Sequence, residues 1–437
     1  MSSLREHDGG IDLPRADAER IRGHLEEFAT LSEPDSGEGV TRLGYSPLER
    51  EAHARFAVHF DELGLSCTTD AAGNSIAVLP GADPSLPALG TGSHLDSVPN
   101  GGRFDGIAGV VAAMELGRML VEASVRPRHP MRFVVFANEE GARFGQACIG
   151  SRLIAGLTAR EDLDRLEDRD GVTVAEAMRG VGIDPARVHE ARWSAENMAA
   201  FIELHIEQGG ILDAEGRSVG VVEVISGSTR IAIDLEGTAS HTGGTPMHHR
   251  ADALAAAAAI VLGVEAIASD DRHRGTRMTV GKLDVRPGSI TTIPGFCRVY
   301  IDVRDVDSQR QREAANEVIS LAYSIARSRQ VKVSSELLAD TSPVILPVGI
   351  RNVLIETATN LGLDYRVLSS GASHDAQMIE RICPTGMIFV PSLNSGISHA
   401  PAELSRPADI ARGTDLLAHT LLRLDGAGAA GDAGGER

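Results

Sequence analysis

Two adjacent glutamates, Glu139 and Glu140, follow an apolar segment of residues 131–137 and precede Gly141. This pattern predicts a buried strand that ends in two carboxylates at the carboxyl edge of a sheet, where open α/β folds carry their sites. One carboxylate could bind a metal there while the other moves a proton. The alternative is a solvated pair at the start of a loop, and the other polar groups of the chain decide between the two readings.

Other imidazoles and carboxylates end predicted strands or lie in the loops that follow them: His94, Asp105, His205 and His399. Such ligands suit zinc, manganese or cobalt. With one glutamate of the pair they form five groups, which match two divalent metal ions that share one carboxylate and hold a bridging hydroxide. A carboxylate outside the ligand set must then pass the proton to the leaving nitrogen.

The first half of the chain alternates between predicted helices and strands. The helices cover residues 15–31, 47–63 and 106–121, and the strands cover 75–79, 88–92, 132–137 and 201–206. Such alternation is typical of an α/β fold with a mostly parallel sheet and helices on both faces.

Beyond Gly220 the pattern changes to β-α-β-β-α-β, which predicts an inserted α+β domain. Its expected elements are a strand at 230–236, a helix at 250–269, strands at 279–285 and 297–303, a helix at 308–329 and a strand at 331–338. We therefore expect a discontinuous catalytic domain over 1–218 and 341–437 and an inserted domain over 219–340. The catalytic domain resumes with a strand at 386–390 and a helix at 407–424, and the glycine-rich residues 426–437 predict a disordered tail.

Bulk composition narrows the possible partners. The net charge of −19 over 437 residues argues against nucleic acid or an anionic membrane as a partner. The four cysteines are far apart and predict neither a disulfide framework nor a thiolate zinc site. The first ten residues contain no apolar core of a signal peptide, and no segment reaches the ~20 apolar residues of a membrane span. A cytoplasmic protein is expected.

Several motifs resemble those of the M20 family of metal-dependent amidohydrolases, and within it the hydantoinase/carbamoylase branch. This branch includes N-carbamoyl-L-amino acid hydrolases, allantoate amidohydrolases and β-ureidopropionases. The motifs lie in family order at residues 92–98, 102–106, 138–144, 203–209, 237–243, 301–304, 370–376 and 398–401.

The resemblance implies a ligand set in which Asp105 bridges two metal ions. The other implied ligands are His94 and His205 on one ion, and Glu140 and His399 on the second. His205 favours the carbamoyl-hydrolysing branch, because the peptidase branch usually has a carboxylate at this position.

The same resemblance assigns roles beyond the ligands. Glu139 would be the general base, and Asp96 would orient the His94 imidazole. His241, in the inserted domain, would reach the active site of a partner subunit and stabilise an oxyanion. This role implies a homodimer in which the inserted domain acts as lid and dimer contact.

Four residues are expected at the substrate. Gln208 would contact the carbamoyl or amide group, or alternatively cap the turn at 209–210. Arg304 suits a substrate carboxylate, or alternatively an ion pair with a neighbouring aspartate. His374 would line the pocket. Thr291 stands where relatives typically have asparagine, so the substrate side of this pocket is expected to differ from theirs, and Ser373 replaces a usual glycine.

The expected activity is hydrolysis of a linear C–N bond in a small carboxylate-bearing molecule, an N-carbamoyl amino acid or a ureido acid. The bridging hydroxide would attack the carbonyl, and Glu139 would transfer the proton. An aminoacylase or dipeptidase that acts on N-acyl amino acids is the nearest alternative. A homologue that binds its ligand without catalysis is the alternative from another class.

Overall fold

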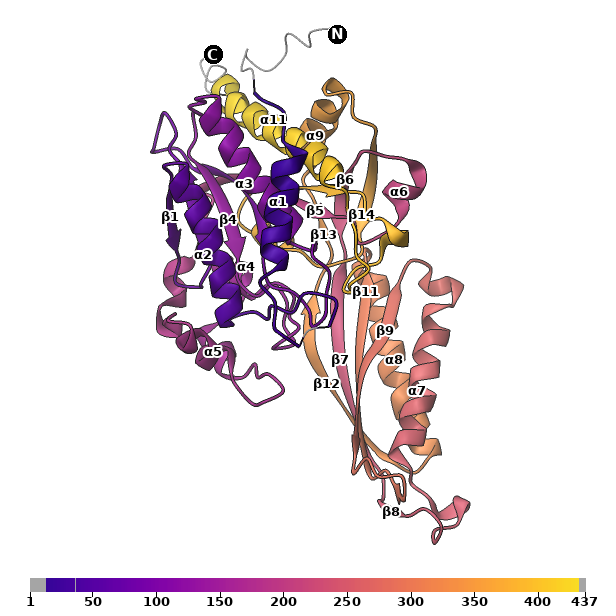
Figure 1. Cartoon of the computed structure of the whole chain (residues 1–437). Coiled ribbons are helices and arrows are strands. Elements are labelled where there is room, and N and C mark those ends of the chain that lie inside the picture. Colours follow the sequence, from indigo (N-terminus) through magenta and orange to yellow (C-terminus); the bar gives the residue numbers. More distant parts are fainter. Residues whose placement is uncertain (1–12, 36, 432–437) are drawn as a thin grey trace. The chain divides into compact units, whose positions relative to one another are not determined.

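A computed structural model describes residues 13–35 and 37–431 (Figure 1). The chain divides into two compact units. The first comprises Met1–Glu223 and Ile345–Arg437, and the second comprises Val224–Val344.

Nine strands among the described residues form one sheet in the first unit, in the order β1-β2-β4-β3-β5-β15-β6-β13, with β14 paired to β6. The strands are β1 (Ser66–Thr69), β2 (Ser75–Leu79), β3 (Ala88–His94), β4 (Met131–Phe136), β5 (Met198–Ile206), β6 (Val219–Ile225), β13 (Val344–Ile345), β14 (Tyr365–Ser370) and β15 (Thr385–Val390). The central strands β4, β3, β5 and β15 run parallel, whereas β2 and β6 pair with this centre in antiparallel fashion. The prediction of a mainly parallel sheet is confirmed.

The helices of the first unit are α1 (Ala18–Ala29), α2 (Pro47–Glu62), α3 (Ile107–Glu122), α4 (Ile149–Ile154), α5 (Val174–Gly180), α6 (Ile211–Glu215), α9 (Val348–Asn360), α10 (Asp375–Ile379) and α11 (Pro407–Gly431). Helix α3 consists largely of Ala, Val, Leu and Met and is buried along most of its length, as a helix that is apolar on all sides must be. It packs on β3 and β5 and contacts α11. This packing places the amino end of α3 beside the carboxyl ends of the central strands.

Local signals account for where the first two helices begin. The Asp17 side chain caps α1 by accepting from two backbone N–H groups, and Ser46 caps α2 ahead of Pro47. Both helices lie within the ranges that the sequence predicts. Helix α11 continues to Gly431 and so includes the first residues of the predicted tail, while 432–437 lie outside the described residues.

The second unit is a four-stranded antiparallel sheet with two helices packed on it. The sheet order is β12-β7-β11-β9, and along the chain the elements run β-α-β-β-α-β. They are β7 (Gly227–Glu236), α7 (Ala253–Ala268), β9 (Arg277–Arg286), β11 (Phe296–Asp305), α8 (Ser308–Ser328) and β12 (Lys332–Thr341). Two short strands, β8 (Ser240–His241) and β10 (Thr292–Ile293), pair with each other.

Strand β6 begins at Val219, where the sequence predicts the start of the inserted domain. It instead pairs with β15 in the main sheet, because its apolar residues fill the core of the first unit.

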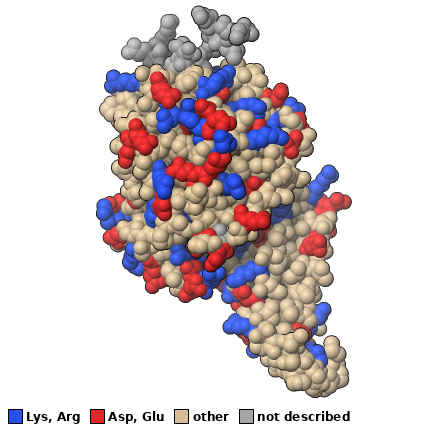
Figure 2. All heavy atoms as spheres, viewed as in Figure 1, with Lys and Arg blue, Asp and Glu red and all other residues tan. Residues whose placement is uncertain are grey.

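No helix among the described residues is long and apolar enough to cross a membrane. On the face drawn in Figure 2, acidic and basic side chains intermingle.

Candidate metal centre

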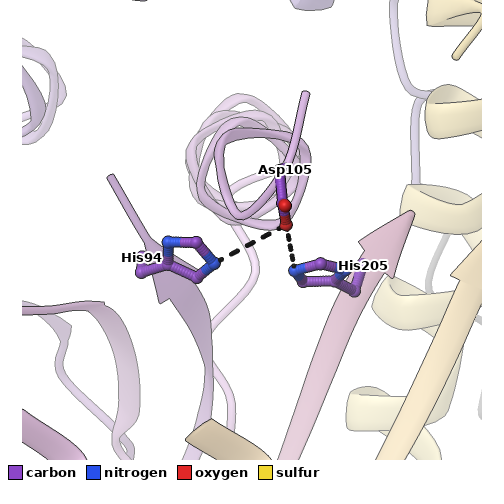
Figure 3. Close-up of side chains that lie close together, drawn as sticks. All are labelled: His94, Asp105 and His205. Atoms are coloured by element: carbon purple, nitrogen blue, oxygen red, sulfur yellow. Dashed lines mark ion pairs between the residues drawn. The ribbon is translucent and has the colours of Figure 1, made fainter. Parts of the chain in front are cut away.

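The predicted ligands of the first cation position lie at the carboxyl ends of parallel strands. His94 is the last residue of β3, and His205 is the penultimate residue of β5. Asp105 ends the loop before α3 and lies between the two imidazoles (Figure 3). Glu139 and Glu140 follow β4 at the same edge of the sheet. This is the edge at which α/β sheets bind ligands.

The two carboxylate oxygens of Asp105 face two different pairs of side chains. Asp105 Oδ1 is 3.2 Å from His205 Nε2 and 3.9 Å from His94 Nε2. Asp105 Oδ2 is 3.1 Å from His399 Nε2, which is in turn 3.2 Å from Glu140 Oε2. The residues therefore form two groups that could each hold a cation, and Asp105 belongs to both.

Backbone groups orient the two buried imidazoles. His205 Nδ1 is 2.9 Å from the carbonyl oxygen of Ile206. His94 Nδ1 is 3.1 Å from the carbonyl oxygen of Asp96. A ring whose Nδ1–H donates to a carbonyl presents the lone pair of Nε2 to a metal. Gly106 has a φ of 70°, and a Cβ there would lie 2.4 Å from the His94 ring, so the turn into α3 requires glycine.

Asp96 connects His94 to the glutamate pair. Its Oδ1 atom accepts from the Glu139 N–H at 2.9 Å, and its Oδ2 atom accepts from the Glu140 N–H at 3.1 Å. The same Oδ1 atom is 3.4 Å from His94 Nδ1. Asp96 thus lies where a residue that orients His94 must lie, and it also holds the backbone of both glutamates.

Glu139 is buried and lies beside the ligand groups. Its Oε2 atom is 3.7 Å from His94 Nε2, and its Oε1 atom accepts from the Cys148 thiol at 3.1 Å. Burial, together with the negative charges of Glu140 and Asp96, raises the pKa of Glu139 to about 7, although His94 acts in the opposite direction. A carboxyl group with such a pKa can both take up and release a proton near neutral pH.

The electrostatics of the site favour positive charge. Burial lowers the pKa of His94, yet the surrounding carboxylates, first among them Asp96, outweigh it and raise the pKa well above its usual value. Burial likewise opposes the charge of His399, but Glu140 and Asp105 raise the pKa of His399 to about 11. Three carboxylates and three imidazoles converge within this small volume. This donor set fits divalent metal ions of the zinc, manganese and cobalt type.

Gln208 makes contacts that its two predicted roles do not describe. Its Nε2 atom donates to Asp105 Oδ2 at 2.8 Å and to Ser398 Oγ at 3.2 Å. The turn that follows is capped instead by Glu207, whose carboxylate accepts from the first two N–H groups of α6. The Gln208 carboxamide therefore lies at the metal centre rather than on the turn.

His374 is buried beside the first cation position. Its ring centroid is 4.5 Å from that of His205, and its Nε2 atom is 2.7 Å from Ser370 Oγ. It lies directly before α10, which begins at Asp375. The structure thus brings His374 to the predicted ligands.

The remaining predicted residues belong to the second unit. His241 is exposed on β8, and its Nδ1 atom accepts from the N–H groups of Gly243 and Gly244 at 3.1 and 3.2 Å. These bonds leave the proton of a neutral ring on Nε2, which can donate. Thr291 accepts from the Thr242 N–H at 3.2 Å and so lies beside His241.

Arg304 occupies the other end of the second unit. It is the penultimate residue of β11 and pairs across the sheet with Ser228. Its Nε atom donates to Asp302 Oδ2 at 2.6 Å, as the ion-pair alternative predicted, whereas Asp305 pairs with Arg310.

Glu403 and Cys148 lie at the centre, but the sequence patterns do not identify them. Glu403 accepts from the backbone of the Asp105 loop, and Cys148 donates to Glu139. Glu403 lies shortly after His399, so its position was a possible signal, but its contacts with residues some three hundred positions earlier could not be read from the sequence. An isolated buried cysteine carried no signal for Cys148.

The family model, the curated relatives and the solved structures that match this chain all indicate the same family. A family model described as peptidase family M20/M25/M40 matches residues 90–423. An N-carbamoyl-L-amino-acid amidohydrolase of Paenarthrobacter aurescens is 39% identical over 415 residues, which cover 95% of this chain and 100% of the relative. The enzyme of that name from Geobacillus stearothermophilus is 40% identical over 93% of this chain and 98% of its own length. A crystal structure of a hydantoinase/carbamoylase family amidase from Burkholderia vietnamiensis matches with a TM-score of 0.89 and 32% identity, covering 95% of this chain and 98% of that one.

Proposed function

Because the chain belongs to the M20/M25/M40 peptidase family and to its hydantoinase/carbamoylase branch, we propose that this metal-dependent amidohydrolase holds two divalent cations and cleaves an N-carbamoyl amino acid or a ureido acid. The observation that carries the proposal is the placement of Asp105, each of whose carboxylate oxygens faces a separate group of ligands. The proposed ligands are His94 and His205 on one side of Asp105, and Glu140 and His399 on the other.

When bound, divalent cations of this kind polarise a carbonyl and make a water acidic enough to attack at neutral pH. The chain supplies the proton transfers. Glu139 accepts the proton of the attacking water and delivers it to the departing nitrogen, which leaves as an amine or ammonia. Cys148 holds one oxygen of Glu139, so the other oxygen, on the His94 side, is the one that moves the proton. Asp96 keeps both glutamates in place through their backbone N–H groups.

The substrate would be bound by residues from two copies of the chain. In the second unit His241 lies beyond the Phe296 end of β11, and Arg304 lies eight residues after Phe296, about 26 Å along the strand. Two side chains that far apart do not contact one small molecule. We propose that Arg304 binds the substrate carboxylate, and that His241 donates to the oxyanion from the partner subunit of a homodimer.

Complementation between two inactive variants tests this shared site. His241→Ala chains retain Glu139, and Glu139→Gln chains retain His241, so a mixed dimer contains one complete site. An equal mixture should recover up to about a quarter of the wild-type activity, because half of the dimers are mixed and each mixed dimer has one intact site of two.

The measurement is turnover by heterodimers isolated through two different affinity tags. As a control, Glu139→Gln chains paired with chains that carry both substitutions should stay inactive. A heterodimer without activity, or a protein that forms no dimer, contradicts the shared site.

A substrate panel tests the proposed reaction. Protein loaded with zinc, manganese or cobalt would be incubated with N-carbamoyl amino acids, ureido acids, N-acyl amino acids and dipeptides, and the released amine or ammonia would be measured. We expect kcat/KM to be highest for a carbamoyl or ureido acid. A preference for a dipeptide or an N-acyl amino acid would favour the aminoacylase alternative, and absence of turnover with every compound would favour a binding homologue.

Thr291 bears on which acid is preferred. Its hydroxyl is shorter than the asparagine side chain of typical relatives, and its backbone carbonyl accepts from the N–H of Thr242, the residue after His241. This arrangement favours a substrate with a bulkier group near the oxyanion.

The cysteines favour a cytoplasmic location. All four are free thiols, which is in keeping with a reducing environment: Cys67, Cys148, Cys297 and Cys383, of which all but the first are buried.

A further inference from the structure

Glu403 is a buried carboxylate that binds the backbone of the Asp105 loop. Only 4% of its surface is exposed. Its Oε1 atom accepts from the N–H groups of Phe104 and Asp105 at 2.9 and 3.0 Å. Two backbone donors on one carboxylate oxygen fix the direction in which the Asp105 main chain enters α3.

The other oxygen of Glu403 reaches the loop that carries His399. The Ser398 hydroxyl donates to Glu403 Oε2 at 2.7 Å, and the same hydroxyl oxygen is 3.2 Å from Asp105 Oδ2. Ser398 directly precedes His399. Glu403 and Ser398 therefore join the bridging carboxylate to the loop of a ligand that lies almost three hundred residues later in the chain.

The Asp105 loop is shaped to accept this carboxylate. A Cβ atom on Gly102 would lie 2.0 Å from Glu403 Oε1, so any side chain at this position would displace Glu403. The base of the other loop is held independently, by the Ser405 hydroxyl, which donates to the Pro391 carbonyl at 2.8 Å, and by the Leu393 N–H, which donates to the Leu404 carbonyl at 2.7 Å. Glu403 thus projects from a fixed base into a space that glycine leaves open.

The two cation positions do not depend on Glu403 equally. His94 and His205 end strands of the central sheet, and each ring is oriented by a nearby carbonyl. His399 instead lies in a loop with a positive φ of 56°, and its side chain is half exposed. Without the Glu403 contacts, the position formed by Asp105, Glu140 and His399 loses the alignment of Asp105 and of the His399 loop. The other position loses only the alignment of Asp105 and keeps its strand-borne ligands His94 and His205.

From these contacts we infer that Glu403 and Ser398 are positioning residues that set the occupancy of the cation position formed by Asp105, Glu140 and His399. The inference rests on the proposed two-cation function. Residues that orient metal ligands in this way typically contribute about 10–100-fold to metal affinity. The larger effect should fall on one of the two binding steps.

The test is a calorimetric titration of the metal-free full-length protein with Co²⁺. The variants are Glu403→Gln, which preserves shape but reverses the polarity toward Ser398, and Ser398→Ala. In each, one binding step should weaken by about 10–100-fold and the other should weaken clearly less. His399→Ala should remove the more affected step, and Glu403→Gln added to His399→Ala should weaken the remaining step only to that lesser extent.

Matched controls separate positioning from general loss of structure. Asp425 also accepts from two distant backbone N–H groups, those of Arg128 and His129 at 2.8 and 2.7 Å, so Asp425→Asn removes an equivalent link away from the centre. Thr414→Ala removes a buried hydroxyl that donates to the Ile410 carbonyl within α11 and has no part in the Asp105 or His399 loops. Both controls should bind Co²⁺ as the wild type does.

The possible outcomes point to different conclusions. Equal weakening of both steps in Glu403→Gln and Ser398→Ala, or two unchanged steps, overturns the positioning role alone. A wild-type protein that binds a single Co²⁺ ion or none overturns the proposed two-cation function and with it this inference. Selective weakening of one step, with controls unchanged, supports both.

Discussion

Replacement of Glu139 by glutamine is expected to lower kcat by about 10²–10⁴-fold while the bound metal stays in place. Glutamine has nearly the same shape as glutamate but cannot accept the proton of the attacking water. The glutamine side-chain oxygen can still accept from the Cys148 thiol, and the backbone N–H of residue 139 still donates to Asp96. The backbone at the centre should therefore not move. Turnover of the best substrate, together with metal content by mass spectrometry, measures the two effects separately.

The control for this variant is Glu115→Gln. Glu115 is a buried carboxylate of the same unit that pairs with Arg20 at 2.7 Å. Its replacement should lower the free energy of unfolding without changing kcat. Near-normal turnover by Glu139→Gln would remove Glu139 from the proton-transfer role, and loss of its metal would make Glu139 a ligand instead.

Replacement of Asp105 by asparagine is expected to abolish turnover and to reduce the bound metal by at least one ion per chain. Asparagine has one carbonyl oxygen and one NH2 group, so only one of the two ligand groups keeps its acceptor. Chelation of the wild-type protein should likewise abolish turnover, and added zinc, manganese or cobalt should restore it. The same addition should not restore the Asp105→Asn variant.

Asp70→Asn is a suitable comparison, because Asp70 accepts from the N–H groups of Ala72 and Asn74 in a turn of the same unit. Its metal content should match that of the wild type. If Asp105→Asn retained full metal content and activity, the bridging role of Asp105 would be wrong.

Much of the site was predictable because its ligands lie at the ends of strands. An apolar segment that ends in His94 or in the glutamate pair indicates both the strand and the edge at which the side chain emerges. The parallel sheet then brings such ends together. Glu403 could not be predicted in this way, because an acidic residue in a loop has no periodic pattern, and its partners at Phe104 and Asp105 are distant in sequence.

The sequence patterns also do not predict several helices and strands whose caps and hydrophobic periodicity are weak. Helix α9 has no side-chain cap and only a narrow buried face, since Ile350, Leu354, Thr357 and Ala358 are its buried residues. Strands β6 and β14 lie where the sequence changes character, and β6 is identified as part of the main sheet only through its pairing with β15. In these cases tertiary packing, rather than local propensity, determines the structure.

Strand β15 lies between β5 and β6, although β5 ends at Ile206 and β15 begins only at Thr385. During synthesis β5 therefore leaves the ribosome after its parallel neighbour β3 but long before its other parallel neighbour, β15. The N–H and C=O groups on the β15 side of β5 form an open edge in the meantime. The nascent chain in this interval carries four of the five proposed ligands, His94, Asp105, Glu140 and His205, and lacks only His399. This edge of β5 is paired only once translation has reached β15, the last strand of the described residues.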